Sequence, residues 1–236
     1  MSGISAIIPT RDRPLYLQTA VESLLAQIDR PREIIVVDDG AGDAAAMARR
    51  DPSIRVLNNH RRGPVPARIL GVQAAAGDAI VFLDDDDWLT DRAYLARAAE
   101  RLSAGAEFCF CDGEMVFDSG APSLPFARDA TVQSLARDNT ILISGVCYGR
   151  ALHWRLGYFD THLPYYWDWD WYLRVARSGA TLARLAARAV AIRVHDQNMS
   201  GDANEAARRA DLAALAAKHG LGELRLKNHL DFAEHR

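Results

Sequence analysis

Four consecutive aspartates, Asp84 to Asp87, follow the apolar run "AIVFL" and precede a tryptophan. Adjacent carboxylates repel one another, and each raises the pKa of its neighbours unless a cation is present. Clustered oxygen ligands favour hard divalent ions such as magnesium, manganese or calcium. The run therefore predicts a bound divalent ion. The alternative is a solvated acidic turn that caps a helix beginning near residue 91.

A group of arginines offers the complementary charge. Arg61 and Arg62 lie in the stretch "HRRGPVPAR", and Arg68 ends it. Guanidinium groups bind diphosphates or carboxylates through two parallel hydrogen bonds, and the N-terminus of a following helix would also face a phosphate. Metal ion, arginine and helix dipole together predict a nucleoside diphosphate ligand. Surface ion pairs are the alternative for all three arginines.

The first half of the chain contains the elements that would bring these groups together. Apolar, β-branched runs predict buried strands at 4–8, 33–37, 54–57 and 79–83. Helical spacing predicts helices from Pro14, over 43–50, over 66–76 with Gly77 ending it, and from a cap at Thr90. This alternation indicates a mainly parallel α/β sheet with helices on both faces. Polar residues follow three of the four strands, at the edge where such sheets bind ligands.

The second half is less regular. Strands are predicted at 107–111, 114–117, 145–150 and 189–195. The first two of these strands could pair with each other. Residues 118–140 are expected to form a loop with a short helix. A helix is predicted over 168–178 and an alanine-rich one over 203–219. The terminal helix is expected either to pack on the domain or to form a homodimer contact.

Composition narrows the class of protein. The 236 residues carry a net charge of −3 with both signs interspersed, which argues against a nucleic-acid partner. No apolar run is long enough for a transmembrane segment, and the start "MSGISAIIPT" lacks the regions of a signal peptide, so the expected location is cytoplasmic. Cys109, Cys111 and Cys147 lack CxxC spacing and are expected to be buried free thiols.

Four stretches resemble, in order and spacing, the family 2 glycosyltransferases: "SAIIPTRDRPLYLQTAVESLLAQ", "EIIVVDDG", "RGPVPAR" and "AIVFLDDDDWL". The resemblance implies one α/β domain of the Rossmann-like GT-A fold over 1–200. Residues 1–102 would form its nucleotide-sugar half and 103–200 its acceptor half, followed by a helical tail, 201–236. It also implies inverting transfer from a nucleotide sugar, usually a UDP-sugar, with Mn²⁺ or Mg²⁺.

The resemblance assigns a donor site residue by residue. Asp39 is similar to the aspartate that reads the nucleobase, and Arg68 to the arginine of the family's "AR" motif. In the DxD-like run the first acid would meet the ribose and the last would bind the metal. "VHDQNMS" places a histidine where it could complete the metal or diphosphate site. The implied nucleotide-sugar contacts are Pro9, Thr10, Asp12, Asp39, Arg68, Asp84 and Asp85, and the implied metal ligands are Asp86 and His195.

The stretch "YYWDWDWYLRVARSG" resembles the acceptor-side motif of the family. Asp168 falls on the position of the base that takes the acceptor's hydroxyl proton; a plain helix N-cap is the alternative. Trp167 stands where the family usually has glutamate, so it and Tyr166 are predicted to bind the acceptor, a small molecule or glycan. Packing in the core is the alternative for these aromatic side chains.

Two other functions stay open at this point. A metal-dependent nucleotidyltransferase or phosphotransferase could use the same acidic edge, but it would normally need a glycine-rich phosphate loop, and "PTRDRP" contains no glycine. A non-catalytic protein that binds a nucleotide sugar is the other. The presence of Arg68, Asp86 and Asp168 argues against it.

Overall fold

The computed structural model of the chain describes residues 3–196, 198–199 and 204–227. Within these ranges the strands are β1 (Ile4–Thr10), β2 (Glu33–Asp38), β3 (Ile54–Asn58), β4 (Ala79–Phe82), β5 (Trp88–Leu89), β6 (Phe108–Phe117), β7 (Leu124–Phe126), β8 (Cys147–Gly149) and β9 (Leu182–Val194). They form one sheet in the order β3-β2-β1-β4-β8-β6-β9-β5, with β7 paired to β6. The chain is therefore a single mixed α/β domain.

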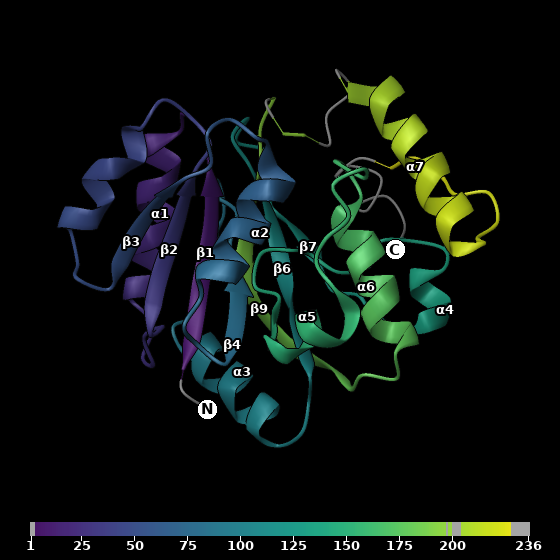
Figure 1. The fold of residues 1–236 in the computed structure, drawn as a ribbon, viewed down its shortest axis with the longest axis horizontal. Coiled ribbons are helices and arrows are strands. Elements are labelled where there is room, and N and C mark those ends of the chain that lie inside the picture. Colours follow the sequence, from purple (N-terminus) through teal and green to yellow (C-terminus); the bar gives the residue numbers. More distant parts are fainter. Residues whose placement is uncertain (1–2, 197, 200–203, 228–236) are drawn as a thin grey trace.

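Helices cover both faces of this sheet (Figure 1). They are α1 (Pro14–Leu25), the 3₁₀ helix η1 (Asp43–Arg49), α2 (Pro64–Ala74), α3 (Tyr94–Ser103), α4 (Val132–Leu135), α5 (Ala151–Leu156), α6 (Trp167–Arg177) and α7 (Glu205–His219). One hydrophobic cluster holds the apolar side chains of α2, α5, α6 and α7, and a second holds those of α1, η1 and α3. No helix in the described ranges is long and apolar enough to cross a membrane.

The first four predicted strands form the parallel part of the sheet. Ile7 pairs with Ile35 and contributes to the first cluster, whereas Ile8 pairs with Val36 and contributes to the second. Successive side chains of a strand point to opposite faces, so both faces of β1, β2 and β4 are buried, as predicted. The edge strand β3 is only partly buried and exposes Arg55 and Asn58. Parallel pairing of β1 with β2 and β4 brings their carboxyl ends to one edge.

The predicted pairing of 107–111 with 114–117 is wrong. These residues form the single strand β6, which runs parallel to β9 with a register irregularity around Asp112. Asp112 lies between the two predicted strands, where it interrupts an apolar run. Its carboxylate instead accepts hydrogen bonds from Arg184, at 2.7 and 3.0 Å, so a partner 72 residues away keeps it inside the strand.

Two helix boundaries also differ from the predictions. Helix α2 ends at Ala74, and Gly77 does not cap it: a Cβ there would lie 2.6 Å from the carbonyl oxygen of Gly3, so close packing against the chain before β1 requires glycine. Helix α3 begins only at Tyr94. Thr90 does not cap it, because its hydroxyl donates to the carbonyl of Arg188 at 2.9 Å. The aspartate run therefore leads into β5, not into a helix.

The tail packs onto the domain. The buried Leu212 and Leu215 of α7 join the first hydrophobic cluster, and leucines of the segment 221–227 pack against it. The predicted boundary between 200 and 201 falls on residues outside the described ranges. Cys109, Cys111 and Cys147 are buried and free, as predicted.

Candidate active site

A cavity of about 460 Å³ opens at the carboxyl edge of β1, β2 and β4 and extends to the start of α6. Its far wall includes three cationic residues of the tail, Arg208, Arg225 and Lys227. Among the residues that line it are most of the predicted site: Pro9, Thr10, Asp39, Arg68, Asp84, Asp85, Asp86, Tyr166, Trp167 and Asp168. The predicted residues Asp12 and His195 are not among the lining residues.

The aspartate run forms a tight, largely buried turn after β4. Asp84, Asp86 and Asp87 each offer a carboxylate oxygen within 4.8 Å of the others. Burial raises the pKa of Asp87 well above its usual range, and the charge of Asp86 raises it further. Burial is also the main cause that raises the pKa of Asp85 to about 7, and the charge of Asp86 is the second cause. Burial and mutual repulsion thus disfavour the ionised forms of these carboxyls, a cost that a bound cation would relieve.

Two side chains outside the run contact Asp86. The guanidinium of Arg13 lies 2.8 Å from its Oδ2, and Nε2 of His195 lies 3.0 Å from the same oxygen. Thr10 donates to Asp85 at 2.7 Å and links the turn to the end of β1. The sequence reasoning missed Arg13, although it lies in the quoted "PTRDRP" stretch after the first strand.

The residues of this turn fit a divalent ion. Asp84, Asp86 and Asp87 offer clustered carboxylate oxygens, the ligands that hard divalent ions prefer, and His195 Nε2 lies within hydrogen-bond distance of Asp86 Oδ2, at 3.0 Å. Asp87 is less available, because its two oxygens accept hydrogen bonds from Ser144 and from the backbone of Arg193. Asp84 and Asp86, with His195 beside them, are therefore the side chains that could hold an ion.

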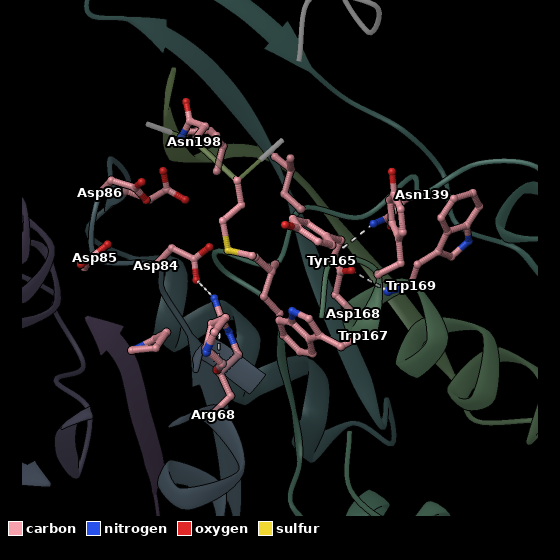
Figure 2. A pocket seen from close by; sticks show the side chains of 18 of the residues that line it. Arg68, Asp84, Asp85, Asp86, Asn139, Tyr165, Trp167, Asp168, Trp169 and Asn198 are labelled. Atoms are coloured by element: carbon pink, nitrogen blue, oxygen red, sulfur yellow. Dashed lines mark hydrogen bonds and ion pairs between the residues drawn. The ribbon is translucent and has the colours of Figure 1, made fainter. Parts of the chain in front are cut away.

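Arg68 connects the aspartate turn to α6. Its guanidinium forms an ion pair with Asp84 and lies 4.6 Å from the centroid of the Trp167 ring (Figure 2). Such stacking favours arginine over lysine, because the guanidinium is planar and weakly hydrated. Arg68 is buried, in contrast to the exposed Arg61 and Arg62. The surface ion-pair alternative is thus wrong for Arg68.

Asp39 lies at the end of β2 and is held by the loop before α2. Its carboxylate accepts hydrogen bonds from Asn59 and, at 3.1 and 3.2 Å, from the backbone of Gly63, which has a φ of +97°. Asn59 is completely buried and was missed by the sequence reasoning. Asp12 is placed differently: its Oδ1 accepts a hydrogen bond from the backbone of Ala41 at 2.8 Å, which ties two loops together.

Asp168 lies in the first turn of α6 and faces the cavity (Figure 2). It is not the N-cap, a position taken by Tyr166. Its Oδ1 accepts a hydrogen bond from the backbone of Trp169 at 2.8 Å, and its Oδ2 accepts one from Asn139 at 3.0 Å. Burial raises the pKa of Asp168 to about 6, although these hydrogen bonds and Arg68 oppose the rise. The group is therefore ionised at neutral pH but close to its titration range.

The aromatic residues around Asp168 belong mostly to the core. Trp167 is 6% exposed and packs edge-on against Phe159, with ring centroids 4.7 Å apart. Trp169 is 3% exposed, and its indole nitrogen donates to the carbonyl of Leu135 at 2.7 Å. Tyr166 is only half-buried. Trp167 thus supports Arg68 from the core while one part of it reaches the cavity.

The second carboxylate of "DWD" has a different environment. Asp170 is fully buried and contacts Arg174 at 2.9 Å, Lys218 at 2.7 Å and His219 at 2.8 Å. Two of these partners belong to the end of α7. Asp170 therefore fixes the tail to α6, as a structural charge and not a second base. Asp211 of α7 adds to this contact by accepting the backbone N–H groups of Tyr165 and Tyr166.

Solved structures of glycosyltransferases share this fold. S. aureus TarS in complex with UDP-GlcNAc aligns with a TM-score of 0.72 at 20% identity, covering 92% of this chain and 66% of that chain. The mannosyltransferase PcManGT from Pyrobaculum calidifontis, in complex with GDP-Man and Mn²⁺, aligns with a TM-score of 0.68 at 19% identity, covering 98% and 66%. At these identities the likeness defines the fold, which is the predicted GT-A fold.

Sequence comparison then identifies the family. The model of glycosyl transferase family 2 matches residues 5–143. The uncharacterized glycosyltransferase YwdF of Bacillus subtilis (strain 168) is 35% identical over 237 residues, covering 95% of this chain and 87% of that protein. The GalNAc(5)-diNAcBac-PP-undecaprenol beta-1,3-glucosyltransferase of Campylobacter jejuni is 33% identical over 117 residues, or 47% of this chain and 38% of that protein. The chain belongs to glycosyl transferase family 2, as its motifs predicted.

Proposed function

We propose that this glycosyltransferase moves a sugar from a UDP-sugar to an acceptor hydroxyl with inversion at the anomeric carbon. The observation that carries the proposal is the shared cavity: the carboxylate of Asp168 and the aspartate turn after β4 line the same space, with Arg68 between them. Such a space can hold a diphosphate at one end and a hydroxyl at the other. The TarS complex with UDP-GlcNAc supports a nucleotide-sugar donor.

The donor would bind along the carboxyl ends of β1, β2 and β4. Asp39 would accept the imide proton of uracil, and Pro9 and Thr10 would contact the nucleotide from the end of β1. Asp84 and Asp85 would lie beside the ribose and diphosphate. Arg68 is already held in place by Asp84 and Trp167, so it would meet the donor with little loss of side-chain entropy.

The metal site would consist of Asp86 and His195. A bound Mn²⁺ or Mg²⁺ would neutralise the charge that develops on the departing diphosphate. The clustered carboxylate oxygens of the turn and the 3.0 Å approach of His195 to Asp86 support this assignment. So does the presence of Mn²⁺ with GDP-Man in the PcManGT structure.

Asp168 would act as the general base. As the acceptor oxygen forms its bond to the anomeric carbon, its proton would pass to Asp168, and the bond to the diphosphate oxygen would break with its electron pair leaving on UDP. A pKa of about 6 suits this role, because the carboxylate is ionised at neutral pH and is a stronger base than an exposed aspartate. A leaving diphosphate needs no protein acid.

The acceptor would enter from the side of Tyr166 and Trp167, opposite the aspartate turn. The same wall includes Arg208, Arg225 and Lys227, so the described part of the tail would help to shape the acceptor site. The proposed acceptor is a small molecule or a glycan.

The first test is binding of the donor. A thermal-shift panel of nucleoside diphosphates and nucleotide sugars, with and without Mn²⁺, should show the largest stabilisation for uridine compounds with the ion. Equal shifts for all bases would refute the assignment of Asp39, and shifts independent of Mn²⁺ would refute that of Asp86.

The second test is transfer itself. UDP-sugars that stabilise the protein should be screened against acceptor libraries for UDP release, and the anomeric configuration of the product read by NMR. A product of opposite configuration to the donor is expected. Retention would overturn the single-displacement mechanism, and tight donor binding without transfer to any acceptor would favour a non-catalytic nucleotide-sugar-binding protein.

A further inference from the structure

Asn139 lies next to the proposed base but outside every motif recognised in the sequence. It belongs to the loop after α4, 29 residues before Asp168 in the chain, and it lines the same cavity. Its Nδ2 donates a hydrogen bond of 3.0 Å to Oδ2 of Asp168 (Figure 2). The other oxygen of Asp168 is held by the backbone of Trp169 at 2.8 Å. Both carboxylate oxygens are thus fixed, one of them by a side chain.

The loop that carries Asn139 is fastened on both sides. The indole of Trp169 donates to the carbonyl of Leu135, at the end of α4, at 2.7 Å. Asp138, the residue before Asn139, forms an ion pair with Lys227 of the tail. These contacts tie the loop to α6 and to the tail. The amide of Asn139 therefore reaches the carboxylate from a supported position.

The orientation of the Asn139 amide follows from chemistry. An ionised carboxylate only accepts hydrogen bonds, so the amide nitrogen must face Asp168. The amide oxygen, Oδ1, is then buried and has no hydrogen-bond partner in the part of the chain that the structure describes. Leaving a buried acceptor unpaired costs stability. Within the described residues, the hydrogen bond to Asp168 is therefore the one that the Asn139 side chain makes.

We propose that Asn139 is a positioning residue for Asp168: its amide fixes the plane of the carboxylate and favours its ionised form. The inference rests on the proposed role of Asp168 as base. A carboxylate held by Trp169 alone could rotate about its terminal torsion, because that torsion has broad minima. With both oxygens held, the carboxylate of Asp168 keeps one orientation, and its free lone pairs can then accept the proton of an acceptor hydroxyl in the cavity.

Other groups around Asp168 also set its protonation. Arg68 of α2 favours the charged form, and Asp84 at the end of β4 opposes it. Tyr166 and Tyr172 also interact electrostatically with Asp168. The hydrogen bond from Asn139 favours the charged form more strongly than either the bond from Trp169 or the charge of Arg68. Its removal should therefore move the acid limb of the pH–rate profile to higher pH.

The test uses two variants of the full-length protein, Asn139→Ala and the nearly isosteric Asn139→Asp. At saturating donor, Asn139→Ala should lower kcat by about 10- to 100-fold, the range for a misplaced reacting group, and shift the acid limb upward. Asn139→Asp should be worse at neutral pH, since two adjacent carboxylates share a proton. The affinity for UDP with Mn²⁺ should stay within about twofold of the parent, because the donor end is untouched.

Gln27→Ala is the matched control. Gln27 is another buried amide, bonded to the carbonyl of Asp91 at 2.9 Å and to the N–H of Leu95 at 3.1 Å, and it does not line the cavity. Its loss should lower the melting temperature without moving the acid limb. The proposal is overturned if Asn139→Asp keeps the parental kcat and acid limb, or if Asn139→Ala behaves like the control. Full activity of Asp168→Asn would instead refute the base itself.

Discussion

Replacing Asp168 with asparagine should remove activity and, at neutral pH, increase stability. As a proposed base with a pKa of about 6, Asp168 is about 90% ionised at pH 7 and about 10% ionised at pH 5. Turnover of the parent should therefore fall roughly ninefold between these values. Asp168→Asn should lower turnover by about 10² to 10⁴, the usual loss for a positioned base, and should abolish this pH dependence.

The effect on stability has the opposite sign. The pKa of Asp168 rises from its ordinary 3.8 to about 6 on folding, so the unfolded chain releases this proton more readily than the folded chain. The difference destabilises the folded protein by up to ~3 kcal/mol at pH 7, and this cost disappears as the pH falls below about 4. An uncharged amide avoids the cost: its oxygen can accept from Trp169, and Asn139 can turn its amide so that its Oδ1 accepts from the new NH₂. The loss of two charge-assisted hydrogen bonds offsets ~1–2 kcal/mol. The net expectation is a gain of about 1–2 kcal/mol at pH 7.

Urea denaturation of the parent and of Asp168→Asn at pH 7 and pH 4 measures this gain. The variant should be the more stable protein at pH 7 and should lose that advantage at pH 4. Calorimetry with UDP and Mn²⁺ should give the same affinity for both proteins. A variant that is less stable at both pH values would refute the argument that burial raises the pKa of this carboxyl. Unchanged turnover would refute its role as base.

Three further perturbations test other parts of the site. Asp86→Ala should weaken Mn²⁺-dependent UDP binding by at least about tenfold in calorimetry, whereas Asp51→Ala, on the surface, should not; equal affinities would remove Asp86 from the metal site. Ending the chain after Gly220 should raise the acceptor KM at least about tenfold and leave UDP affinity unchanged. Ending it after Lys227 keeps the cavity-lining residues Arg225 and Lys227, so the acceptor KM and the UDP affinity should both stay unchanged. Asp170→Asn should lower the unfolding free energy by about 1.5–3 kcal/mol at pH 7, because the buried carboxylate loses its charge-assisted contacts to Arg174 and Lys218. The cost should shrink in acid, since the ion pairs lower the pKa of Asp170 and their contribution is lost as the carboxyl protonates.

The first half of the chain was predictable because its signals are local. Each of the first four strands is a short, mostly apolar run, and polar side chains that line the cavity lie at or just after the ends of β1, β2 and β4, at Thr10, Asp39 and Asp84. Parallel pairing then gathers these strand ends at one edge without further information. The same reasoning predicted that Arg68 lies near this edge, because the loop before it follows the third strand of the same sheet.

The other half depends on contacts between distant segments. The sequence predicted two strands in place of β6, because the charge of Asp112 is compensated by Arg184, which lies 72 residues later in the chain. Arg13 and Asn139 were missed because the acids they contact, Asp86 and Asp168, lie 73 and 29 residues away. Such pairs leave no periodic pattern in the sequence.

The two aspartates of "DWD" show how environment divides identical residues between function and structure. Asp170 is buried against Arg174, Lys218 and His219, and these partners hold its pKa below the ordinary value despite burial. Asp168 receives its hydrogen bonds from two neutral donors, and burial raises its pKa to about 6. A carboxylate paired with fixed cations has little tendency to take a proton, whereas one held by neutral donors stays basic. In the Asp84–Asp87 turn, burial and neighbouring carboxylates outweigh the arginines: the pKa values of Asp84 and Asp85 are raised although Arg68 and Arg13 oppose the rise.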